Sequence, residues 1–247
     1  MVEQLRGAAV VRDLDDPDLQ DQAVALYRSV FGGAPESGLE LNTRLLSAVL
    51  RNGGTALGMV EDGALLGFAV GFCGSRDGSV YHYSQTAAVA PEHRGRGLGR
   101  TIKLAQAASA RAAGATRMRW SFDPAVARNG HFNLDVLGAA GRWYVEDFYH
   151  RPGTDRVVVD WDLTESDVAE PPVAPPTPGP ATGEMGHWTL DGDVGSLVVP
   201  ANGLVPAPVR DRIREGFRAL LGHGMVARSC VRVAPDRAVY VFTGATS

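Results

Sequence analysis

A short segment in the middle of the chain combines closely spaced glycines with arginines, and these residue types together suit an anion. Glycines let the backbone approach a ligand closely, successive amides can point into one hollow, and the amino end of a helix adds a partial positive charge. A strand-like run ending at Pro91 precedes the segment, and a helical pattern follows it. We therefore predict a diphosphate site here. Its residues are Arg94, Gly95, Arg96, Gly97, Leu98, Gly99, Arg100 and Thr101.

Spacing separates three classes of phosphate-binding loop that this segment could represent. A Walker A loop needs Lys and then Ser or Thr directly after a glycine, whereas Gly99 is followed by Arg100 and Thr101. A Rossmann loop needs a glycine at position 100 and an acidic residue about 20 residues later. Neither requirement is met, because position 100 is Arg and the next acidic residue after Glu92 is Asp123. The pattern that fits is R-x-x-G-x-G, entered from a strand and continuing into a helix.

The elements that must position this loop are visible in the first 165 residues, which alternate strand and helix signals. Three consecutive strand-like runs before the loop indicate an antiparallel meander. The helix after the loop is expected to bury a stripe formed by Leu98, Ile102, Ala105, Ala108 and Ala112. Helices are expected over residues 18–31, 39–50, 97–113 and 125–137, and strands over 8–13, 55–61, 64–73, 80–89, 117–122, 139–148 and 156–163.

A second region begins after a proline-rich stretch. Six of the 15 prolines fall between residues 171 and 180, so residues 166–183 are predicted to form a semi-rigid linker. Beyond the linker, strand and helix signals alternate again over residues 184–247. Roughly 65 residues bury little core alone, so we expect a small α+β domain that docks on residues 1–165 or on another subunit, giving a homodimer.

Charge and composition exclude several classes of function. The net charge is −4, although residues 93–122 hold seven basic residues and no acidic one. Aromatic residues do not interleave with these basic residues before Trp120, so we expect no nucleic-acid partner. Cys73 and Cys230 lie far apart, which predicts neither a disulfide framework nor a metal site. The chain shows no signal peptide and no apolar run of roughly 18 residues, so we expect a cytoplasmic protein without membrane contacts.

The motif, the strand before it and the order of elements resemble the GNAT superfamily of N-acetyltransferases over residues 7–163. The resemblance implies an α/β fold, with a mixed and mostly antiparallel sheet flanked by helices, that takes acetyl-CoA or another acyl-CoA as cosubstrate. It further implies that pantetheine lies beside the fourth strand, where backbone groups of Ala87, Ala88 and Val89 meet it, and that residues 94–101 wrap the pyrophosphate.

The helix after the fifth strand carries further residues that the resemblance concerns. Asn129 matches the Asn that usually faces the coenzyme in this family, and Phe132 lies one turn further as a second expected contact. The position where the family carries a Tyr that protonates the departing thiolate is Leu134 here. This departure leaves the general acid open.

Acyl transfer to an amine needs a base, a donor for the developing oxyanion and a proton for the thiolate. His82, Ser84 and Thr86 should share one face of the fourth strand because side chains alternate with a period of two. His82 is our candidate base, directly or through water, and Ser84 lies beside it as a second catalytic candidate. The alternative is that His82 is a hydrogen-bonded structural residue.

For the acid, the candidates are Asn133, Tyr144 and Tyr149. Asn133 could instead make a core hydrogen bond, and Tyr144 could be a packing aromatic. If the acyl group or the acceptor carries a carboxylate, Arg128 or Arg142 could bind it with a bidentate fork, or either could be a solvated charge.

Residues 122–124 and 127–134, together with the C-terminal extension, resemble a bacterial subgroup of GNAT proteins, some of which N-acylate amino acids, including by N-succinylation. We therefore predict an acyltransferase that moves an acetyl or succinyl group from CoA to the primary amine of a small molecule, an amino acid among the candidates, by direct attack in a ternary complex. The alternative is a non-catalytic module that senses acyl-CoA.

Overall fold

The computed structural model describes residues 8–32, 41–76, 78–164, 183–202 and 205–244. Contacts divide the chain into unit 1, Met1–Met118 with Leu163–Ala169, and unit 2, Arg119–Asp162 with Glu170–Ser247. This division differs from the predicted boundary at residue 165. The proline-rich stretch can be recognised locally in the sequence. The strand pairing that joins distant parts of unit 2 leaves no such local signal. All but the last residue of the expected linker lies outside the described residues.

Unit 1 is built on an antiparallel sheet with the strand order β1-β2-β3-β4. The expected strand at residues 55–61 is found at these residues, and the helix expected over 97–113 is confirmed with ends one residue inside the prediction. The elements are β1 (Val10–Asp13), α1 (Pro17–Phe31), α2 (Thr43–Arg51), β2 (Thr55–Glu61), β3 (Ala64–Arg76), β4 (Ser79–Val89) and α3 (Leu98–Ala112).

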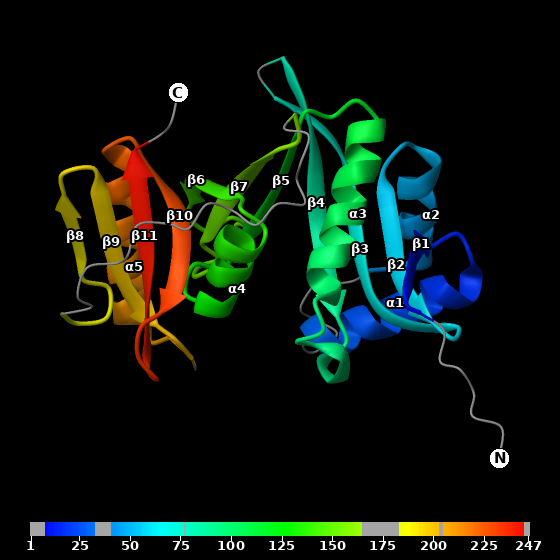
Figure 1. Ribbon diagram of the computed structural model, residues 1–247, viewed down its shortest axis with the longest axis horizontal. Coiled ribbons are helices and arrows are strands. Elements are labelled where there is room, and N and C mark those ends of the chain that lie inside the picture. The colour runs from blue at the N-terminus through cyan, green and yellow to red at the C-terminus, as the bar shows by residue number, and fades with distance from the viewer. Residues whose placement is uncertain (1–7, 33–40, 77, 165–182, 203–204, 245–247) are drawn as a thin grey trace. The chain divides into compact units, whose positions relative to one another are not determined.

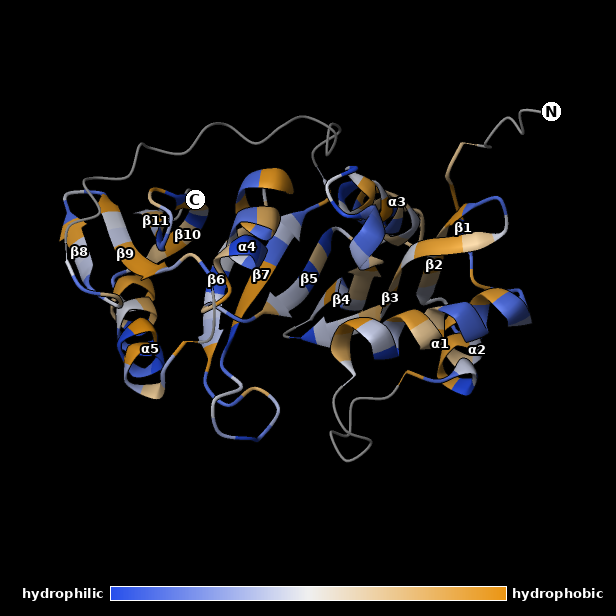
Figure 2. Ribbon diagram, turned by 90° about the horizontal axis from the view of Figure 1, so that it is seen from below, coloured by the Kyte–Doolittle hydropathy of each residue, from blue (hydrophilic) through white to orange (hydrophobic). Residues whose placement is uncertain are grey.

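Helices cover both faces of this sheet (Figure 2). Val70 of β3 belongs to the apolar cluster that α1 and α2 complete, whereas its neighbour Ala69 belongs to the cluster that contains Leu98 and Ile102 of α3. Because successive strand residues point to opposite faces, α3 lies on the face opposite to α1 and α2. The sequence places this helix directly after the glycine-arginine loop, so packing of α3 on the sheet fixes the loop.

A β-bulge interrupts β4. Gly71 lies opposite Ser84 and Val70 lies opposite Thr86, which leaves Gln85 as an extra residue. An extra residue reverses the alternation of side chains beyond it. Thr86 therefore shares the face of Val70, toward α1 and α2, whereas Ser84 points to α3. The expectation that Thr86 shares a face with the candidates before it is wrong, because a bulge leaves no signal in a period-two pattern.

Unit 2 contains the strand order β5-β7-β6-β10-β11-β9-β8, in which the strands from β6 onward pair antiparallel (Figure 1). One helix, α5, buries Phe217 against Tyr144, Tyr240 and Phe242. The elements are β5 (Arg117–Phe122, in unit 2 from Arg119), α4 (Ala127–His131), β6 (Ala140–Val145), β7 (Arg156–Asp162), β8 (Trp188–Asp191), β9 (Val194–Pro200), α5 (Ala207–Gly222), β10 (Met225–Arg232) and β11 (Arg237–Gly244).

The helix expected over residues 125–137 is shorter and irregular. A regular α-helix covers only α4, and one π-helical turn, Phe132–Val136, follows it. Asp135 in this turn accepts hydrogen bonds from the Ser229 hydroxyl and from the Cys230 amide of β10. π-Helical turns often mark functional positions. Here the turn attaches residues 119–162 to the C-terminal strands.

Candidate functional site

The glycine-arginine loop has the geometry of an anion cradle. After β4 the chain makes one 3-10 turn, Pro91–His93, and then passes through Gly95 and Gly97, whose φ values are +78° and +77°. Residues other than glycine rarely adopt this left-handed backbone conformation. Leu98 is the first residue of α3 and is buried against the sheet, which holds the amino end of the helix directly after the two glycines.

The space over this loop is open. A Cβ atom built on Gly95 or Gly97 would meet no heavy atom within 4 Å. Gly97 is the N-cap residue of α3, and no side chain there accepts a hydrogen bond from the first-turn amides. An anion can therefore approach amides that need acceptors, at the positive end of the helix dipole. These observations fit the diphosphate predicted from the sequence.

The arginines of the loop differ in their present contacts. The Nε of Arg94 donates to the Val89 carbonyl at 3.4 Å, which draws this side chain toward the end of β4. Arg96 forms an ion pair with Glu61 at 3.2 Å and is hydrogen-bonded to His93 at 3.1 Å. Exposed pairs of this kind contribute about 0–1 kcal/mol, so a ligand anion could replace Glu61 as the partner of Arg96 at little cost.

The other residues that were expected to contact the coenzyme differ in how exposed they are. In unit 1, Ala87 and Thr101 are exposed, Val89, Gly99 and Arg100 are half-buried, and Ala88 is buried toward α1 and α2. In unit 2, Asn129 and Phe132 are half-buried on α4 and at the start of the π-helical turn.

His82 and Ser84 lie in a buried polar network between the sheet and α3. The Nε2 of His82 is 3.0 Å from the Thr55 hydroxyl, which accepts from the Gln106 amide at 2.9 Å. The Ser84 hydroxyl donates to Gln106 at 2.8 Å and accepts from the Lys103 ammonium at 2.9 Å. All five side chains are buried. The structure thus brings two of the predicted catalytic residues together, but away from solvent.

Burial sets the protonation of this network. Desolvation, with a smaller contribution from the charge of Lys103, lowers the pKa of His82 from 6.5 to about 4. Desolvation also lowers the pKa of Lys103 well below its ordinary value. His82 is therefore neutral at pH 7. Since Thr55 accepts from Gln106, its hydroxyl proton is available to Nε2 of the neutral imidazole.

Sequence reasoning missed Thr55, Lys103 and Gln106. The stripe expected on α3 is wrong beyond Ile102, because its three alanines are exposed or half-buried, whereas Lys103, Gln106, Ala107 and Ala110 are buried. The signal was present: Lys103 lies four residues before Ala107, and Gln106 lies four residues after Ile102 and four before Ala110, on the same face. A stripe drawn through apolar residues alone omits both of them because they are polar.

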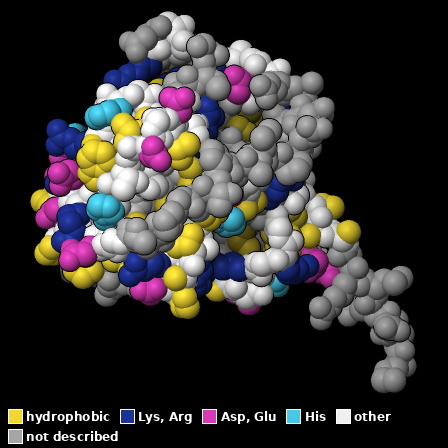
Figure 3. Space-filling model, turned by 60° about the vertical axis from the view of Figure 1, so that its left-hand side comes forward, with side chains coloured by type: hydrophobic (Ala, Val, Ile, Leu, Met, Phe, Trp, Pro, Cys, Tyr) yellow, Lys and Arg dark blue, Asp and Glu magenta, His cyan; other side chains and the backbone are white. Residues whose placement is uncertain are grey.

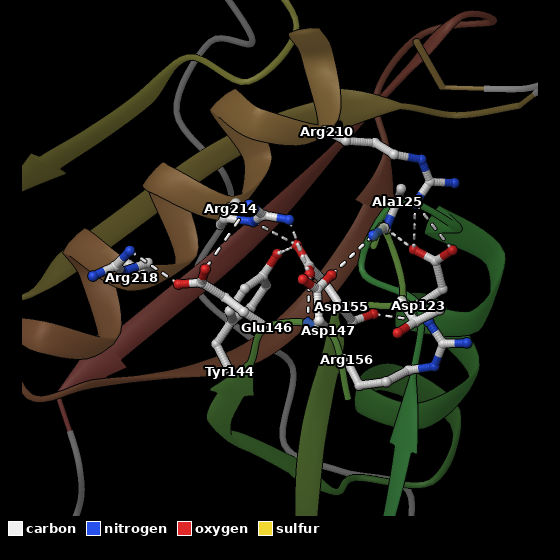
Figure 4. A network of polar contacts seen from close by, with 12 residues as sticks. Asp123, Ala125, Tyr144, Glu146, Asp147, Asp155, Arg156, Arg210, Arg214 and Arg218 are labelled. Atoms are coloured by element: carbon white, nitrogen blue, oxygen red, sulfur yellow. Dashed lines mark hydrogen bonds and ion pairs between the residues drawn. The ribbon is translucent and has the colours of Figure 1, made fainter. Parts of the chain in front are cut away.

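The other catalytic candidates belong to unit 2 and are already engaged. The Asn133 side-chain carbonyl accepts from the Trp120 indole at 2.8 Å. The Tyr144 hydroxyl donates to Asp155 at 2.6 Å, and Arg214 binds the same carboxylate through Nε at 2.8 Å (Figure 4). Burial and the hydrogen bond to Asp155 raise the pKa of Tyr144.

These contacts favour structural roles for Asn133 and Tyr144. A raised pKa makes the Tyr144 phenol a weaker proton donor, and the Asn133 side-chain carbonyl already accepts one hydrogen bond from a buried indole. Leu134, where the family Tyr would be counted, is buried at 1% exposure. A catalytic role for Asn133 and Tyr144 stays a prediction, and the proposed function below does not depend on it.

The described residues bear on two further features, a metal site and a membrane-spanning helix. No cluster of three or more His, Cys, Asp or Glu side chains is arranged to hold a metal ion among them. Within the same residues, no helix is both long and apolar enough to span a bilayer. Basic and acidic side chains are interspersed over the face of the molecule that Figure 3 shows.

The chain is similar to known proteins in part of its sequence and in its structure. The sequence model of the acetyltransferase (GNAT) family matches residues 22–132, from α1 into the π-helical turn. No curated protein matches the chain in sequence.

Solved structures with the same fold include three acetyltransferases. The yncA protein of Salmonella typhimurium, solved with acetyl-CoA, is 22% identical over 68% of this chain and 100% of its own, with a TM-score of 0.52. A GNAT-family protein of Desulfovibrio desulfuricans is 18% identical over 63% of this chain and 99% of its own, with a TM-score of 0.52. An aminoglycoside 6'-N-acetyltransferase complexed with coenzyme A is 12% identical over 63% and 98%, with a TM-score of 0.51.

Because these identities are low, the structural similarity shows the fold alone. The family match is independent of it and includes the glycine-arginine loop. The expected GNAT fold, with additional C-terminal strands, is confirmed. The chain carries its R-x-x-G-x-G loop in the strand–loop–helix setting described above, and this loop lies within residues 22–132, the part of the chain that matches the acetyltransferase (GNAT) family.

Proposed function

We propose that the protein transfers an acyl group from a CoA thioester to the primary amine of a small molecule. The observation that carries this proposal is the loop between β4 and α3, which combines two left-handed glycines, open space over both of them and a helix N-terminus without a side-chain cap. A loop of this kind suits the two phosphates of CoA. Two solved GNAT relatives contain acetyl-CoA or CoA, which supports the same ligand here.

In this proposal, two groups of residues hold the coenzyme. The loop residues 94–101 bind the pyrophosphate through their amides, with Arg94 and Arg96 adding charge. The backbone of Ala87, Ala88 and Val89 contacts the pantetheine arm. The thioester supplies an acyl group that is already activated toward an amine.

We propose that the amine attacks the thioester carbonyl directly: the C–N bond of an amide forms, the C–S bond breaks, and CoA leaves as its thiol while the nitrogen loses a proton. His82 and Ser84 act as positioning residues. Ser84 is fixed by Lys103 and Gln106 immediately before the bulge at Gln85. The bulge sets which way the residues from Thr86 to Val89 point. A rigid network before it therefore fixes the strand end that leads into the loop, which matters because misplacement by about 1 Å can cost a hundredfold in rate.

The experiment that tests this function is a thiol-release assay with acetyl-CoA and succinyl-CoA against a panel of primary amines, amino acids among them. We expect release that depends on both the acyl-CoA and one class of amine. Thermal stabilisation by acyl-CoA without thiol release across a broad panel would contradict transfer and support the sensing alternative instead.

A further inference from the structure

Two neighbouring strands of unit 2 each carry an arginine at a β-bulge. In β6, Gly141 and Trp143 lie opposite consecutive residues of β7, which makes Arg142 the extra residue. In β10, Ala227 and Ser229 lie opposite consecutive residues of β11, which makes Arg228 the extra residue. Bulges re-aim side chains and are frequent beside functional sites.

The two bulges are adjacent in space. Strands β6 and β10 are neighbours in the sheet (Figure 1), and they pair through Gly141 and Ala227. Arg142 and Arg228 each follow one member of this pair. In an antiparallel pair, the residues that follow two paired positions lie diagonally on one face, roughly 7–8 Å apart. The pKa of Arg228 is lowered by burial and by the charge of Arg142, which agrees with this placement.

One carboxylate lies beside these guanidinium groups. Asp160 of β7 accepts from the Nε of Arg119 at 2.8 Å, and its other oxygen lies 3.6 Å from the Nε of Arg142. The Asp160 side chain is only 3% exposed. Arg119 and Arg142 therefore share the carboxylate of Asp160, and Arg228 follows the residue paired with Gly141 on the neighbouring strand.

The Nε of Arg142 is the feature that calls for a ligand. It is a buried nitrogen for which the described part of the chain offers no acceptor within hydrogen-bond distance. Its ion pair with Asp160 at 3.6 Å is longer than a hydrogen bond, and leaving a buried donor of a charged group without a hydrogen bond is costly. The Arg142 side chain as a whole is 29% exposed, so solvent and solutes can reach it.

An apolar surface borders the same place. Trp143 is 41% exposed, and the guanidinium of Arg119 lies over its ring at 4.8 Å. A small molecule held by the arginines would find an aromatic face for its carbon atoms beside them.

We propose that Arg142 and Arg228, with Arg119 beside them, form a binding site for the carboxylate of a small substrate. A guanidinium presents two parallel N–H donors, which match the two oxygens of a carboxylate. The inference rests on the proposed acyl transfer and gives it a substrate class: either the acyl donor is a dicarboxylic half-thioester or the amine acceptor is an amino acid.

Turnover selectivity tests the site and separates the two sources. One arm compares succinyl-CoA with acetyl-CoA, and the other compares an amino acid with its carboxamide. We expect wild-type kcat/KM to favour the carboxylate in one arm, and Arg142→Gln and Arg228→Gln each to reduce that preference by about tenfold or more. Arg232→Gln removes the same charge from an exposed position of β10 and should retain the preference.

A conservative variant separates the fork from the charge alone. Arg142→Lys keeps the positive charge but loses the paired donors, so its preference should lie between those of the wild type and Arg142→Gln. It also serves if Arg142→Gln does not fold. Equal selectivity in wild type, Arg142→Lys and Arg228→Gln would overturn the proposal, as would loss of selectivity only in Arg128→Gln.

Binding measured without turnover keeps this inference distinct from the proposed function. Succinate and an amino acid are titrated by ligand-observed NMR into wild type and the variants. Saturable binding that Arg142→Gln and Arg228→Gln weaken would support the carboxylate site even if no amine is acylated. Turnover of neutral substrates with no carboxylate binding in wild type would overturn the site and leave acyl transfer intact.

Discussion

The protonation of His82 predicts how strongly the free energy of unfolding should depend on pH. Its pKa is lowered from 6.5 to about 4 by burial, which is nearly complete at 1% exposure, and by the charge of Lys103. Because the unfolded chain binds the proton more readily than the folded one, folding is favoured above pH 6.5 and this stabilisation is lost as pH falls from 6.5 to about 4. A fall of about 2.5 in pKa corresponds to about 3 kcal/mol.

Replacing His82 with Gln removes this titration while keeping a polar group near Thr55. We expect the wild type to lose about 3 kcal/mol more than His82→Gln between pH 7 and pH 4. The chain's four tryptophans, Trp120, Trp143, Trp161 and Trp188, all belong to unit 2. Fluorescence therefore does not report on unit 1, and the assay is hydrogen exchange of β2 to β4 at a series of pH values. His187→Gln, at an exposed position, is the control.

The same change has a kinetic counterpart. A positioning residue that is neutral from pH 5 upward should not produce an ascending limb near pH 6.5 in the profile of kcat/KM, so any such limb should persist in His82→Gln. An NMR titration that places the imidazole pKa of His82 near 6.5 would refute the reasoning. So would a limb near pH 6.5 that disappears in the variant.

Three further predictions concern unit 2, where urea unfolding followed by tryptophan fluorescence is the measurement. Asp155→Asn should cost about 1–3 kcal/mol, because it removes the carboxylate that accepts two hydrogen bonds from the half-buried Arg214 guanidinium; an unchanged midpoint would contradict this. Hydrogen bonds hold the pKa of Asp155 below its ordinary value, so the wild type should also lose stability as pH falls through that lowered pKa, more steeply than the variant. Tyr240→Phe should cost about 1–3 kcal/mol of unfolding free energy, because it removes the hydrogen bond to the Pro124 carbonyl. Gly130→Ala should also cost about 1–3 kcal/mol, because its Cβ would press on the Tyr240 ring. Unchanged stability in both variants would exclude the contact of Tyr240 with residues 124–130.

Much of unit 1 could be predicted from the sequence because its signals are local. The spacing of Arg94, Gly97 and Gly99 and the strand before them identified the loop, and the structure places the helix start one residue from the expected position. Glycine in this motif is a backbone requirement, which a sequence displays directly.

The faces of the strands could not be predicted in the same way. Bulges at Gln85, Arg142 and Arg228 change which way side chains point, and they depend on pairing with a neighbouring strand that no local pattern reveals. For this reason Arg142 could be named as a candidate for a carboxylate, but its companion Arg228 could not.

The division into units was hidden for a related reason. Residues 119–162 join the C-terminal strands through contacts between positions about 60 to 115 apart in sequence, such as Arg214 with Asp155 and Tyr240 with Pro124. Such contacts follow from shape and charge in the folded chain, whereas composition marked only the proline-rich stretch.

The central claim is that the loop containing Gly95 and Gly97 captures the diphosphate of a CoA species, and calorimetric titration with CoA and acetyl-CoA tests it most directly. We expect one saturable site per chain with a dissociation constant between about 1 μM and 1 mM. Gly97→Val should weaken binding at least about tenfold, since its side chain would occupy the open space over the loop. Gly63→Val is the matched control, because Gly63 also has a positive φ and open space around it. Unaltered affinity in Gly97→Val, or no heat with any CoA species in the wild type, would contradict the account.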